Sequence, residues 1–457
     1  MISLTSQSVP RTISKLALPM LAGTFAINTY NLTDTWFVSR LGTNPLAAMS
    51  FAMPVTMLLS FVMMALGSGT MTVVAHALGG GKHAKAARIT THSILLVVLF
   101  SLVLAACGFS SMNWLFGQLG AAGESLELTR QFMTIWYIGM PVMALQQMLG
   151  SVLTSTGNTK ASSALMVAGT LINLALAPVM IFGFFGFPRL GIRGAALATL
   201  LSQACILGFT LRVLHRRHRL LSTAVRSYRR IAISWRRVLN MGVPAIYSSI
   251  LTPLSSAIIT RIVAGYGEPA VAALGVAGRI EMFSFMVPMS VGMSLTPFVA
   301  QNFGAGRLDR IHEARRLTTV FALGYGLIMT ACFFLAADFL SGLFSDDPAL
   351  RSVLVKYIHI TCFGYGFMEV HRYSTMFMNG IQKPLNSAAL NTLRIVALLI
   401  PLAVVGSRLY GLNGLFAGRL IADILSAVAG LYFVSHVLRA GRRAAARQQE
   451  LRAGRAA

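Results

Sequence analysis

The sequence has few acidic residues and few charged residues of either sign. Asp and Glu number 13 among 457 residues, and all charged residues together make up 11% of the chain. Hydrophobic residues make up 55%, and the mean hydropathy is +0.69. A chain with so little charge has too few polar side chains to cover a soluble globular surface. The composition therefore excludes an ordinary soluble domain and is typical of a polytopic membrane protein.

Cysteine is also scarce, with four residues in the chain. Cys107, Cys205, Cys332 and Cys362 all lie inside apolar runs, and no two of them form a CxxC pair. This spacing argues against a disulfide framework, a zinc site or a thiol redox motif. We expect the four residues to pack as small apolar side chains, and we expect no cofactor and no resident metal.

Long apolar runs are what the sequence does contain. Each is about 20 residues long or more, enough to cross a hydrocarbon core of roughly 30 Å as a helix. The runs lie near residues 13–36, 46–76, 90–112, 131–155, 162–185, 192–214, 238–264, 275–300, 317–341, 353–378, 387–406 and 412–438. The sequence therefore predicts about twelve membrane-spanning helices.

The basic residues indicate how these spans are oriented. With the N-terminus inside, most of the 38 Lys and Arg fall in cytoplasmic segments, as the positive-inside rule requires. The two densest clusters, 215–230 and 439–455, then lie on the cytoplasmic side and are not interleaved with aromatic residues. We interpret them as topology signals that also contact anionic lipids, rather than as a nucleic-acid site. The first apolar run lacks a small-residue cleavage site. The sequence thus predicts a multi-pass protein of the bacterial inner membrane, with both termini cytoplasmic.

An internal repeat organises the chain. The segment HALGGGK, residues 76–82, matches QNFGAGR, residues 301–307, at an offset of 225, because 304 minus 79 is 225. The same offset pairs Pro19 with Pro244 and extends without a gap back to the first span. Further on, we align TGNTK (156–160) with NGIQK (379–383), and LGIRG (190–194) with YGLNG (410–414). The two halves are therefore one unit repeated.

Each half contains about six spans, so both copies enter the membrane in the same direction. The predicted fold is all-α, with twelve transmembrane helices in two six-helix bundles related by pseudo-twofold symmetry. Parallel repeats of this kind are typical of transporters whose halves alternate about a central site. We divide the chain into an N-terminal lobe (1–214), a basic linker (215–237), a C-terminal lobe (238–438) and a basic tail (439–457). Both lobes lie in one chain, so we expect a monomer.

One acid lies inside the first span without a basic residue one helical turn away. This is Asp34, whose neighbours on the preceding turn are Tyr30 and Asn31. A carboxylate inside a membrane needs a partner, water or a proton. Neutral surroundings suit a group that exchanges a proton or that helps to bind Na+. We therefore predict that Asp34 and Asn31 take part in cation coupling. Adding 225 gives Ile259, so the second half has an aliphatic residue at this position. The alternative is an acid near the outer headgroups that has no functional role.

Two further intramembrane acids have arginines on their own helices. Glu369 is followed by Arg372 three residues later, and Asp423 follows Arg419 by one turn. These spacings allow ion pairs along each helix. The pairs predict a structural role more than a functional one, although Glu369 stays a secondary candidate for cation coupling.

The fourth intramembrane acid, Glu281, is left without a predicted partner. Its neighbour Arg279 lies two positions earlier, which places the two side chains on different faces of a helix. Glu281 therefore stays a secondary candidate for cation coupling.

Methionines form a face on the eighth span. Met282, Met286 and Met289 share this face, and Met57 and Met64 are the repeat equivalents of Met282 and Met289. Thioether side chains adapt to ligands of varied shape. We therefore predict a substrate cavity lined by these five methionines and by Tyr30. Helix packing or contact with lipid is the alternative.

Taken together, these motifs resemble those of the multidrug and toxic compound extrusion family. The resemblance rests on NLTDTWFVSRLG with LAAMSF, on HALGGGK and QNFGAGR, and on AGRIEMF, and it covers essentially the whole chain. The resemblance implies two six-helix bundles that export organic cations and other hydrophobic compounds in exchange for H+ or Na+.

The resemblance also implies roles for individual residues. Asp34 matches the first-span aspartate that the family uses for cation coupling, and Asn173 matches its fifth-span asparagine. The chain departs from many relatives at Ala177, where they have a second acid before the proline. Glu369 lies on the span where another branch has an acid. The loss of one carboxylate favours coupling to a single proton through Asp34.

Two other functions compete with antiport. A lipid or lipid-linked oligosaccharide flippase would have a cavity lined by several arginines, whereas few basic residues lie within the spans. A membrane enzyme acting on lipids would need a group such as a His and carboxylate pair. His371 beside Glu369 and Arg372 is the cluster that could supply one.

Overall fold

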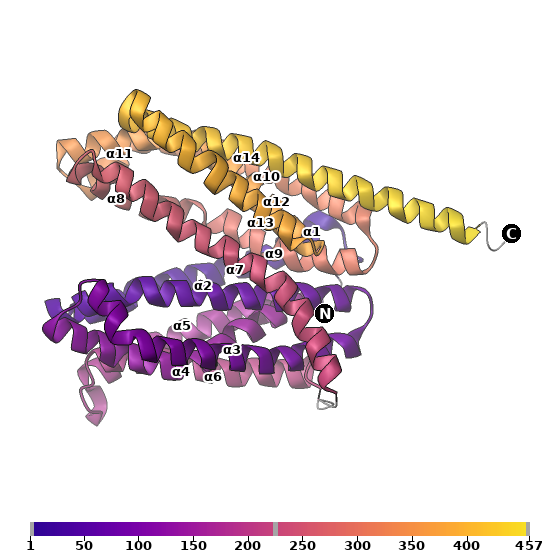
Figure 1. Ribbon diagram of the computed structural model, residues 1–457, viewed down its shortest axis with the longest axis horizontal. Helices are drawn as coiled ribbons and strands as arrows, with labels where there is room; N and C mark the ends of the chain where they lie inside the picture. The colour runs from indigo at the N-terminus through magenta and orange to yellow at the C-terminus, as the bar shows by residue number, and fades with distance from the viewer. Residues whose placement is uncertain (1–3, 223–226, 454–457) are drawn as a thin grey trace. The chain divides into compact units, whose positions relative to one another are not determined.

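The computed structural model describes residues 4–222 and 227–453, without the side chains of residues 31–32 and 441–453. Its described residues form helices and the turns between them, with no strand (Figure 1). The first half contains α1 (Val9–Ser39), α2 (Thr43–Gly79), α3 (His83–Gln118), α4 (Gly123–Ser155), α5 (Thr159–Phe182), the 3₁₀ turn η1 (Phe184–Gly186), and α6 (Ile192–Arg212) with the π-helical η2 (Val213–Arg217).

The second half has more breaks in its helices. It contains α7 (Tyr228–Ala264), α8 (Glu268–Ser284), α9 (Met286–Gly304), α10 (Leu308–Phe344), α11 (Pro348–Thr361), the 3₁₀ turn η3 (Cys362–Gly364), α12 (Tyr365–Gly380), α13 (Pro384–Thr392), the π-helical η4 (Leu393–Leu399) and α14 (Ile400–Ala453).

These helices confirm the twelve predicted spans. Seven helical segments among the described residues are long and apolar enough to cross a membrane, and α8 with α9 forms an eighth if the bent pair is one span. One of the seven, Pro384–Ala440, contains two predicted spans, because α14 leaves helical geometry at Tyr410 and Gly411. The other three predicted spans lie on α1, α4 and α11 with α12, which carry more polar side chains.

Contacts divide the chain into two compact units. Among the described residues, the N-terminal unit contains Leu4, 14–222 and 227–246, and the C-terminal unit contains Thr5–Ile13 and 247–453. The first part of α7 therefore packs with the N-terminal unit, although it follows the basic linker in sequence. Likewise, the start of α1 packs with the C-terminal unit. This division of packing is distinct from the repeat boundaries predicted at 214 and 238.

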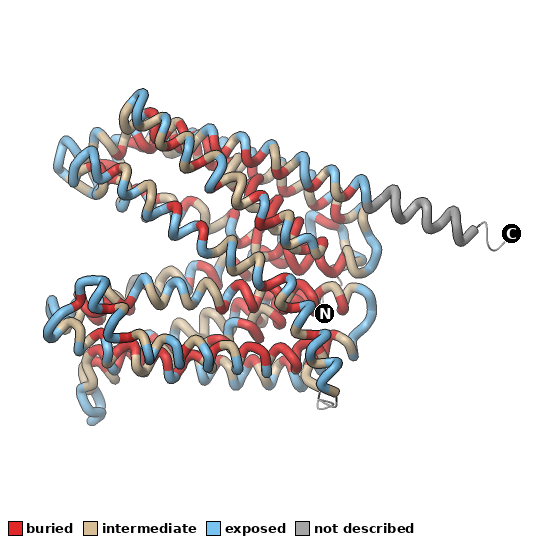
Figure 2. The backbone as a smooth tube through the Cα atoms, in the orientation of Figure 1, coloured by how far each residue is buried: buried red, intermediate tan, exposed pale blue. Residues whose placement is uncertain are grey.

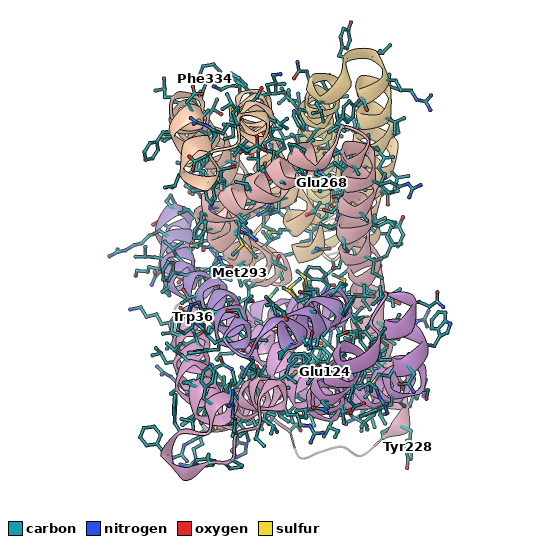
Figure 3. All side chains as sticks on the ribbon, turned by 90° about the vertical axis from the view of Figure 1, so that its left-hand side faces the viewer. Trp36, Glu124, Tyr228, Glu268, Met293 and Phe334 are labelled. Carbon is teal, nitrogen blue, oxygen red and sulfur yellow. The ribbon has the colours of Figure 1, made fainter. Side chains whose placement is uncertain are left out.

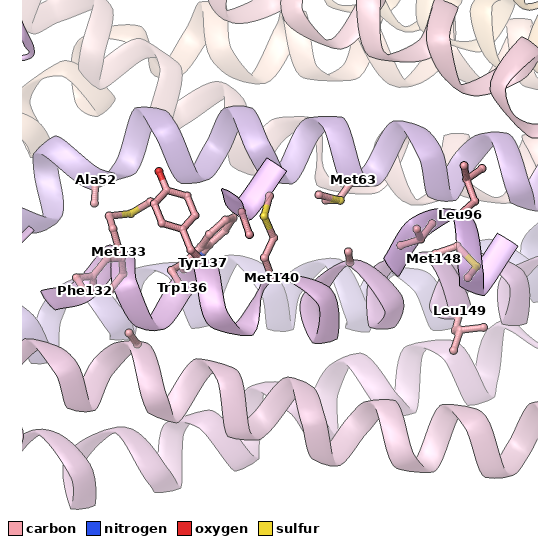
Figure 4. Close-up of a cluster of buried hydrophobic side chains, with 14 of the residues drawn as sticks. Ala52, Met63, Leu96, Phe132, Met133, Trp136, Tyr137, Met140, Met148 and Leu149 are labelled. Atoms are coloured by element: carbon pink, nitrogen blue, oxygen red, sulfur yellow. The ribbon is translucent and has the colours of Figure 1, made fainter. Parts of the chain in front are cut away.

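Each unit has its own apolar core. In the N-terminal unit the core is built around α4, whose Met133, Tyr137, Met140 and Met148 are almost fully buried (Figure 4). In the C-terminal unit a second core includes Phe416, and Ile259, the repeat counterpart of Asp34, packs against it. Buried and exposed positions alternate around most helices, so each helix has one packed face (Figure 2).

The repeat is visible in the backbone of the turns. The turns before α3, α5, α10 and α13 each contain a residue with φ between 61° and 79°, namely Gly81, Gly157, Gly306 and Gln382. Since Gly157 and Gln382 are 225 residues apart, the offset does not shift here, and the alignment of TGNTK with NGIQK was wrong by two positions. The alignment matched glycine to glycine, but the residue of the second half that takes the left-handed conformation of Gly157 is Gln382, at a position that usually selects glycine.

Another pair of turns confirms the alignment of LGIRG with YGLNG. Gly191 has φ 56° and ψ −130°, and Gly411 has φ 61° and ψ −143°. Both glycines begin a helix that packs closely on the preceding one. A Cβ added at Gly194 would meet the Met180 carbonyl, and one added at Gly414 would meet the Gly406 carbonyl.

The eighth span is broken, which corrects the prediction of one continuous methionine face. Helices α8 and α9 meet at Phe285 with a bend of 57°. Pro288 has no N–H to donate to the carbonyl of Ser284, and the hydroxyl of Tyr325 donates to that carbonyl instead, at 2.7 Å. Met282 therefore lies on α8, whereas Met286 and Met289 lie on α9.

The cysteines also differ from the prediction. Cys362 is buried, but Cys107, Cys205 and Cys332 are exposed on their helices. An apolar side chain in a membrane protein faces lipid as readily as it faces a core, so span position alone does not predict burial.

Candidate functional site

The N-terminal unit holds α1 against α5 through polar contacts to the α1 backbone. The hydroxyl of Ser163 donates to the carbonyl of Pro19, and the hydroxyl of Thr170 donates to the carbonyl of Ala26 at 3.2 Å. Gly23 allows the close approach, because a Cβ at this position would meet the sulfur of Met166 at 3.0 Å. These contacts fix the part of α1 that precedes Asp34.

Asp34 lies in the last third of α1 and is buried, with 7% of its surface exposed. Its Oδ1 atom has no hydrogen-bond partner among the described residues, and no ion pair involves its carboxylate there. A buried carboxylate without a counterion is costly unless it is protonated or binds a cation. Asp34 therefore has the properties of a group that binds and releases a cation.

Neutral polar groups surround this part of α1. The hydroxyl of Tyr30, one turn before Asp34, lies 2.9 Å from Oγ1 of Thr199 on α6. The Nδ2 atom of Asn173 on α5 donates to the same Oγ1 at 3.4 Å. Thr199 thus joins α1, α5 and α6 in one polar cluster. The resemblance places Asn173 in the same site as Asp34, but the sequence does not reveal Thr199, because a threonine in an apolar run gives no signal of its own.

The N-terminal unit contains three more positions that the sequence singles out, Asn31, Ala177 and Tyr30. The side chain of Asn31, predicted to take part in cation coupling, lies outside the described residues. Ala177, which the resemblance places where many relatives have an acid, is fully buried. Tyr30, predicted to line the substrate cavity, directs its hydroxyl into the polar cluster.

The C-terminal unit pairs its acids differently from the prediction. Arg419 does not pair with Asp423 on its own helix. Its Nη2 atom donates to Oε2 of Glu281 at 2.9 Å, and its Nη1 atom donates to the hydroxyl of Tyr357. Tyr357 in turn donates to Oε1 of Glu281 at 2.7 Å. Glu281, left without a partner by the sequence, is therefore fully hydrogen-bonded by two other helices.

Asp423 pairs instead with Arg394, at 2.7 Å. Arg394 lies on the π-helical η4, and π-helical turns inside α-helices often reposition a functional side chain. Helical spacing reveals only partners on the same helix, so it could not predict this pair.

Glu369 keeps its predicted partner. Its Oε1 atom lies 3.1 Å from Nη1 of Arg372, although the geometry is not that of a hydrogen bond. His371 contacts a different residue, since its Nε2 atom lies 3.2 Å from Oδ1 of Asn391. The three-residue cluster therefore does not form the His and carboxylate pair that a membrane enzyme would need.

The predicted substrate methionines are accessible. Met57, Met64, Met282 and Met289 are between 39% and 52% exposed, and Met286 is half-buried. Met57 and Met64 belong to the N-terminal unit and the others to the C-terminal unit. That all five line one cavity stays a prediction.

A model of the MatE family matches the chain twice, over residues 19–179 and 244–405. The two matches begin 225 residues apart, because 244 minus 19 is 225. The family model thus recognises the same repeat that the sequence showed.

Similar proteins extend over most of the chain. A FAD transporter of Shewanella oneidensis is 34% identical over 435 residues, which cover 95% of this chain and 96% of that protein. The probable multidrug resistance protein YoeA of Bacillus subtilis is 28% identical, with 78% of each chain covered. The multidrug export protein MepA of Staphylococcus aureus is 24% identical, with 92% of each chain covered.

Solved structures with the same fold include the Vibrio cholerae MATE transporter VcmN in its bent form. The TM-score is 0.90 at 26% identity, and the match covers 95% of this chain and 98% of that one. A MOP superfamily transporter from Pyrococcus furiosus matches with a TM-score of 0.87 at 22% identity, covering 96% and 98% of the two chains. The latter likeness shows the fold alone.

Proposed function

Because this chain belongs to the MatE family of transporters, we propose that it is a secondary active antiporter, which exports small organic compounds in exchange for H+ or Na+. Members of this family transport small molecules and are not enzymes, so the alternative of a membrane enzyme is excluded. The coupling ion, the substrate class and the orientation in the inner membrane are parts of the proposal.

The observation that carries the proposal is the state of Asp34. It is the one acid well inside the spans for which the described residues provide no counterion, and it adjoins a cluster of neutral oxygen and nitrogen groups. Its repeat counterpart, Ile259, packs as an ordinary apolar residue. The asymmetry indicates that Asp34 has a role beyond building the six-helix unit.

The residues suggest how coupling would work. A proton on Asp34 would remove the unpaired buried charge, and Na+ would neutralise it while binding oxygen ligands. Either event would stabilise an arrangement of α1, α5 and α6 around the Thr199 cluster. Substrate binding that favours the opposite arrangement would then be weakened by the ion, because linkage between two ligands is reciprocal. Export follows because the ion moves inward down its own gradient and thereby drives the substrate outward.

Two substrate groups compete. The names of YoeA and MepA favour export of drugs, whereas the more similar relative is named a FAD transporter. Export of a flavin dinucleotide is therefore a second candidate. A lipid flippase would need several free arginines in its cavity, and it is weakened because Arg372, Arg394 and Arg419 are each paired with an acid.

The test is transport by purified protein in proteoliposomes, with pH and Na+ gradients imposed separately. Asp34→Asn keeps the size and polarity of the side chain but removes the titrating group. The matched control is Glu124→Gln, an exposed acid of the same unit that accepts a hydrogen bond from Asn44. We expect Asp34→Asn to abolish gradient-driven transport and Glu124→Gln to retain it, with both variants folded by size-exclusion chromatography. Undiminished transport by Asp34→Asn would contradict the coupling role.

We infer a monomer in the cytoplasmic membrane of a bacterium, with both termini cytoplasmic and basic segments near anionic lipids. Cysteine labelling at the basic linker, in intact cells and in inverted vesicles, tests the orientation. Labelling of the linker in intact cells by an impermeant reagent would contradict it.

A further inference from the structure

We propose that the transported substrate is an organic anion carrying phosphate on an aromatic body, and that Arg279 on α8 binds its charge. This inference rests on the proposed transport function and decides between its two substrate groups. It follows from the position of Arg279, from the state of the acids inside the spans, and from the side chains that share its face.

Arg279 lies within the eighth predicted span. Helix α8 begins at Glu268, labelled in Figure 3 together with Met293 on α9. Arg279 is eleven residues further on, which places its Cα roughly 16 Å along the helix axis from that start. A hydrocarbon core is roughly 30 Å thick. This position lies inside the eighth predicted span, 275–300, four residues from its start.

The guanidinium of Arg279 is exposed and makes no ion pair among the described residues. The acid nearest in sequence, Glu281, faces the core side and is bound by Tyr357 and Arg419. The positions one turn away from Arg279 on either side, Gly275 and Phe283, provide no acid. No described acid therefore neutralises its positive charge.

An exposed, unpaired arginine within a span cannot face hydrocarbon without a large penalty. Such residues face water-filled cavities and mark the path of an ion or a substrate. The packing of α8 agrees with this assignment. Its buried residues, Ala273, Ala277 and Ile280, form the opposite face of the helix. The face that carries Arg279 is therefore the one that borders water.

The acids inside the spans do not offer a site for an organic cation. Glu281, Glu369 and Asp423 are each ion-paired with an arginine. Asp34 is buried, with 7% of its surface exposed. The charge left available to a ligand is therefore positive. A guanidinium binds phosphate oxygens through two parallel hydrogen bonds and repels a cationic drug.

The same face of α8 suits an aromatic body. Met282 and Phe283 follow Arg279 by three and four positions and are 39% and 56% exposed. A thioether and a phenyl ring can cover a flat ring system. Gly275 and Gly278 leave room, since a Cβ added at either would meet nothing within 4 Å. A nucleotide-type anion fits this combination of charge, aromatic contact and space.

The experiment compares three probes in proteoliposomes under the effective gradient. FAD carries phosphates and a flavin, riboflavin carries the flavin without phosphate, and ethidium is an aromatic cation. The variants are Arg279→Gln, Arg279→Lys and the control Arg408→Gln, an exposed arginine beside the break in α14. We expect wild type to transport FAD faster than riboflavin or ethidium. We expect Arg279→Gln to reduce the FAD rate roughly tenfold, Arg279→Lys to retain an intermediate rate, and Arg408→Gln to match wild type.

Two results would overturn the inference while leaving the antiporter intact. One is FAD transport by Arg279→Gln at the wild-type rate, and the other is wild-type transport of ethidium but not of FAD. If wild type moves no probe under either gradient, the proposed transport function fails separately. In that case flavin fluorescence in detergent measures FAD binding directly. Weaker binding by Arg279→Gln than by Arg408→Gln would still support the anion site, and equal or absent binding would refute it.

Discussion

The side chain of Arg394 donates two hydrogen bonds to a single oxygen of Asp423, from Nε at 2.9 Å and from Nη2 at 2.7 Å. The arginine reaches this oxygen from the π-helical η4, and the acid lies on α14 with 3% of its surface exposed. The pair joins two spans of the C-terminal unit across 29 positions in the sequence.

Removing one member of this pair should destabilise the protein. Asp423→Asn leaves the guanidinium without a counterion, and breaking a buried ion pair typically costs about 3–5 kcal/mol. The double variant Arg394→Met with Asp423→Leu removes both charges and should recover most of the loss. Thermal unfolding in detergent, followed by size-exclusion chromatography, measures both. A single variant as stable as wild type would show that the pair contributes little.

The crossing of α2 and α7 in the N-terminal unit depends on Gly69. A Cβ at this position would meet the backbone nitrogen of Gly242 at 2.9 Å and the carbonyl of Val238 at 3.0 Å. Gly69→Ala should therefore lower stability by about 1–3 kcal/mol. The control is Gly208→Ala on α6, where an added Cβ meets nothing within 4 Å and should be neutral or stabilising. Equal unfolding temperatures for the two variants would contradict the close crossing.

Replacing Gln382 by glycine should stabilise the turn before α13. Gln382 has φ 61°, whereas glycine occupies the matching position of the three equivalent turns. The left-handed conformation costs an L-residue about 1–2 kcal/mol, part of which glycine loses again through its greater unfolded-state freedom. The reverse change, Gly306→Gln, has open space around it and should destabilise. Unfolding temperatures that shift in the same direction for both variants would be inconsistent with this account.

His218 should make the protein less stable in acid. Burial lowers the pKa of His218, and the positive charges of Arg217 and His83 lower it further. The unfolded chain therefore binds a proton as the pH falls below about 6.5, before the folded chain does. Stability is fully present above that pH and decreases as the pH falls from there to the folded pKa.

The variant that tests this is His218→Gln, which cannot titrate and can still contact Asn158, now 3.3 Å from Nε2 of the histidine. Unfolding temperatures measured between pH 7.5 and pH 5 should decrease less in the variant than in wild type, as the removal of one titrating group requires. Identical pH profiles would show that His218 does not contribute.

Thr199 should affect transport more than folding. Thr199→Val removes the hydroxyl that contacts Tyr30 and Asn173, and each lost hydrogen bond is worth about 1 kcal/mol. We expect a reduced initial transport rate with little change in the amount of folded protein. Thr199→Ser keeps the hydroxyl and should transport at a rate close to wild type. Full activity of Thr199→Val would remove the cluster from the coupling site.

Much of the fold could be predicted from the sequence, because its signals are local or periodic. The twelve spans follow from apolar runs, and the repeat follows from glycine-containing turns such as Gly81 and Gly306, where a left-handed φ selects the residue. The break at Phe285 was missed. Pro288 is visible in the sequence, but its effect depends on the hydroxyl of Tyr325, which lies 41 positions away.

The candidate site was predictable only in part, for a related reason. The lack of a basic residue near Asp34 is a local property and could be recognised. The partners of Glu281 and Asp423 are non-local, because Arg419 and Arg394 reach them from other helices. Helical spacing proposed Arg419 for Asp423, and the tertiary structure gives Arg419 to Glu281. Thr199 gained its role through contacts with α1 and α5 that no pattern in α6 records.

The division of α7 and α1 between the two units sets the order in which the chain can complete its fold. The N-terminal unit needs residues up to Ile246, so it cannot finish packing until synthesis has passed the basic linker. The C-terminal unit needs Thr5–Ile13, which are among the first residues made. That stretch must wait for partners more than two hundred positions later, and such long-range closures slow folding. A half-length chain, cut at the linker, would therefore leave both halves incomplete.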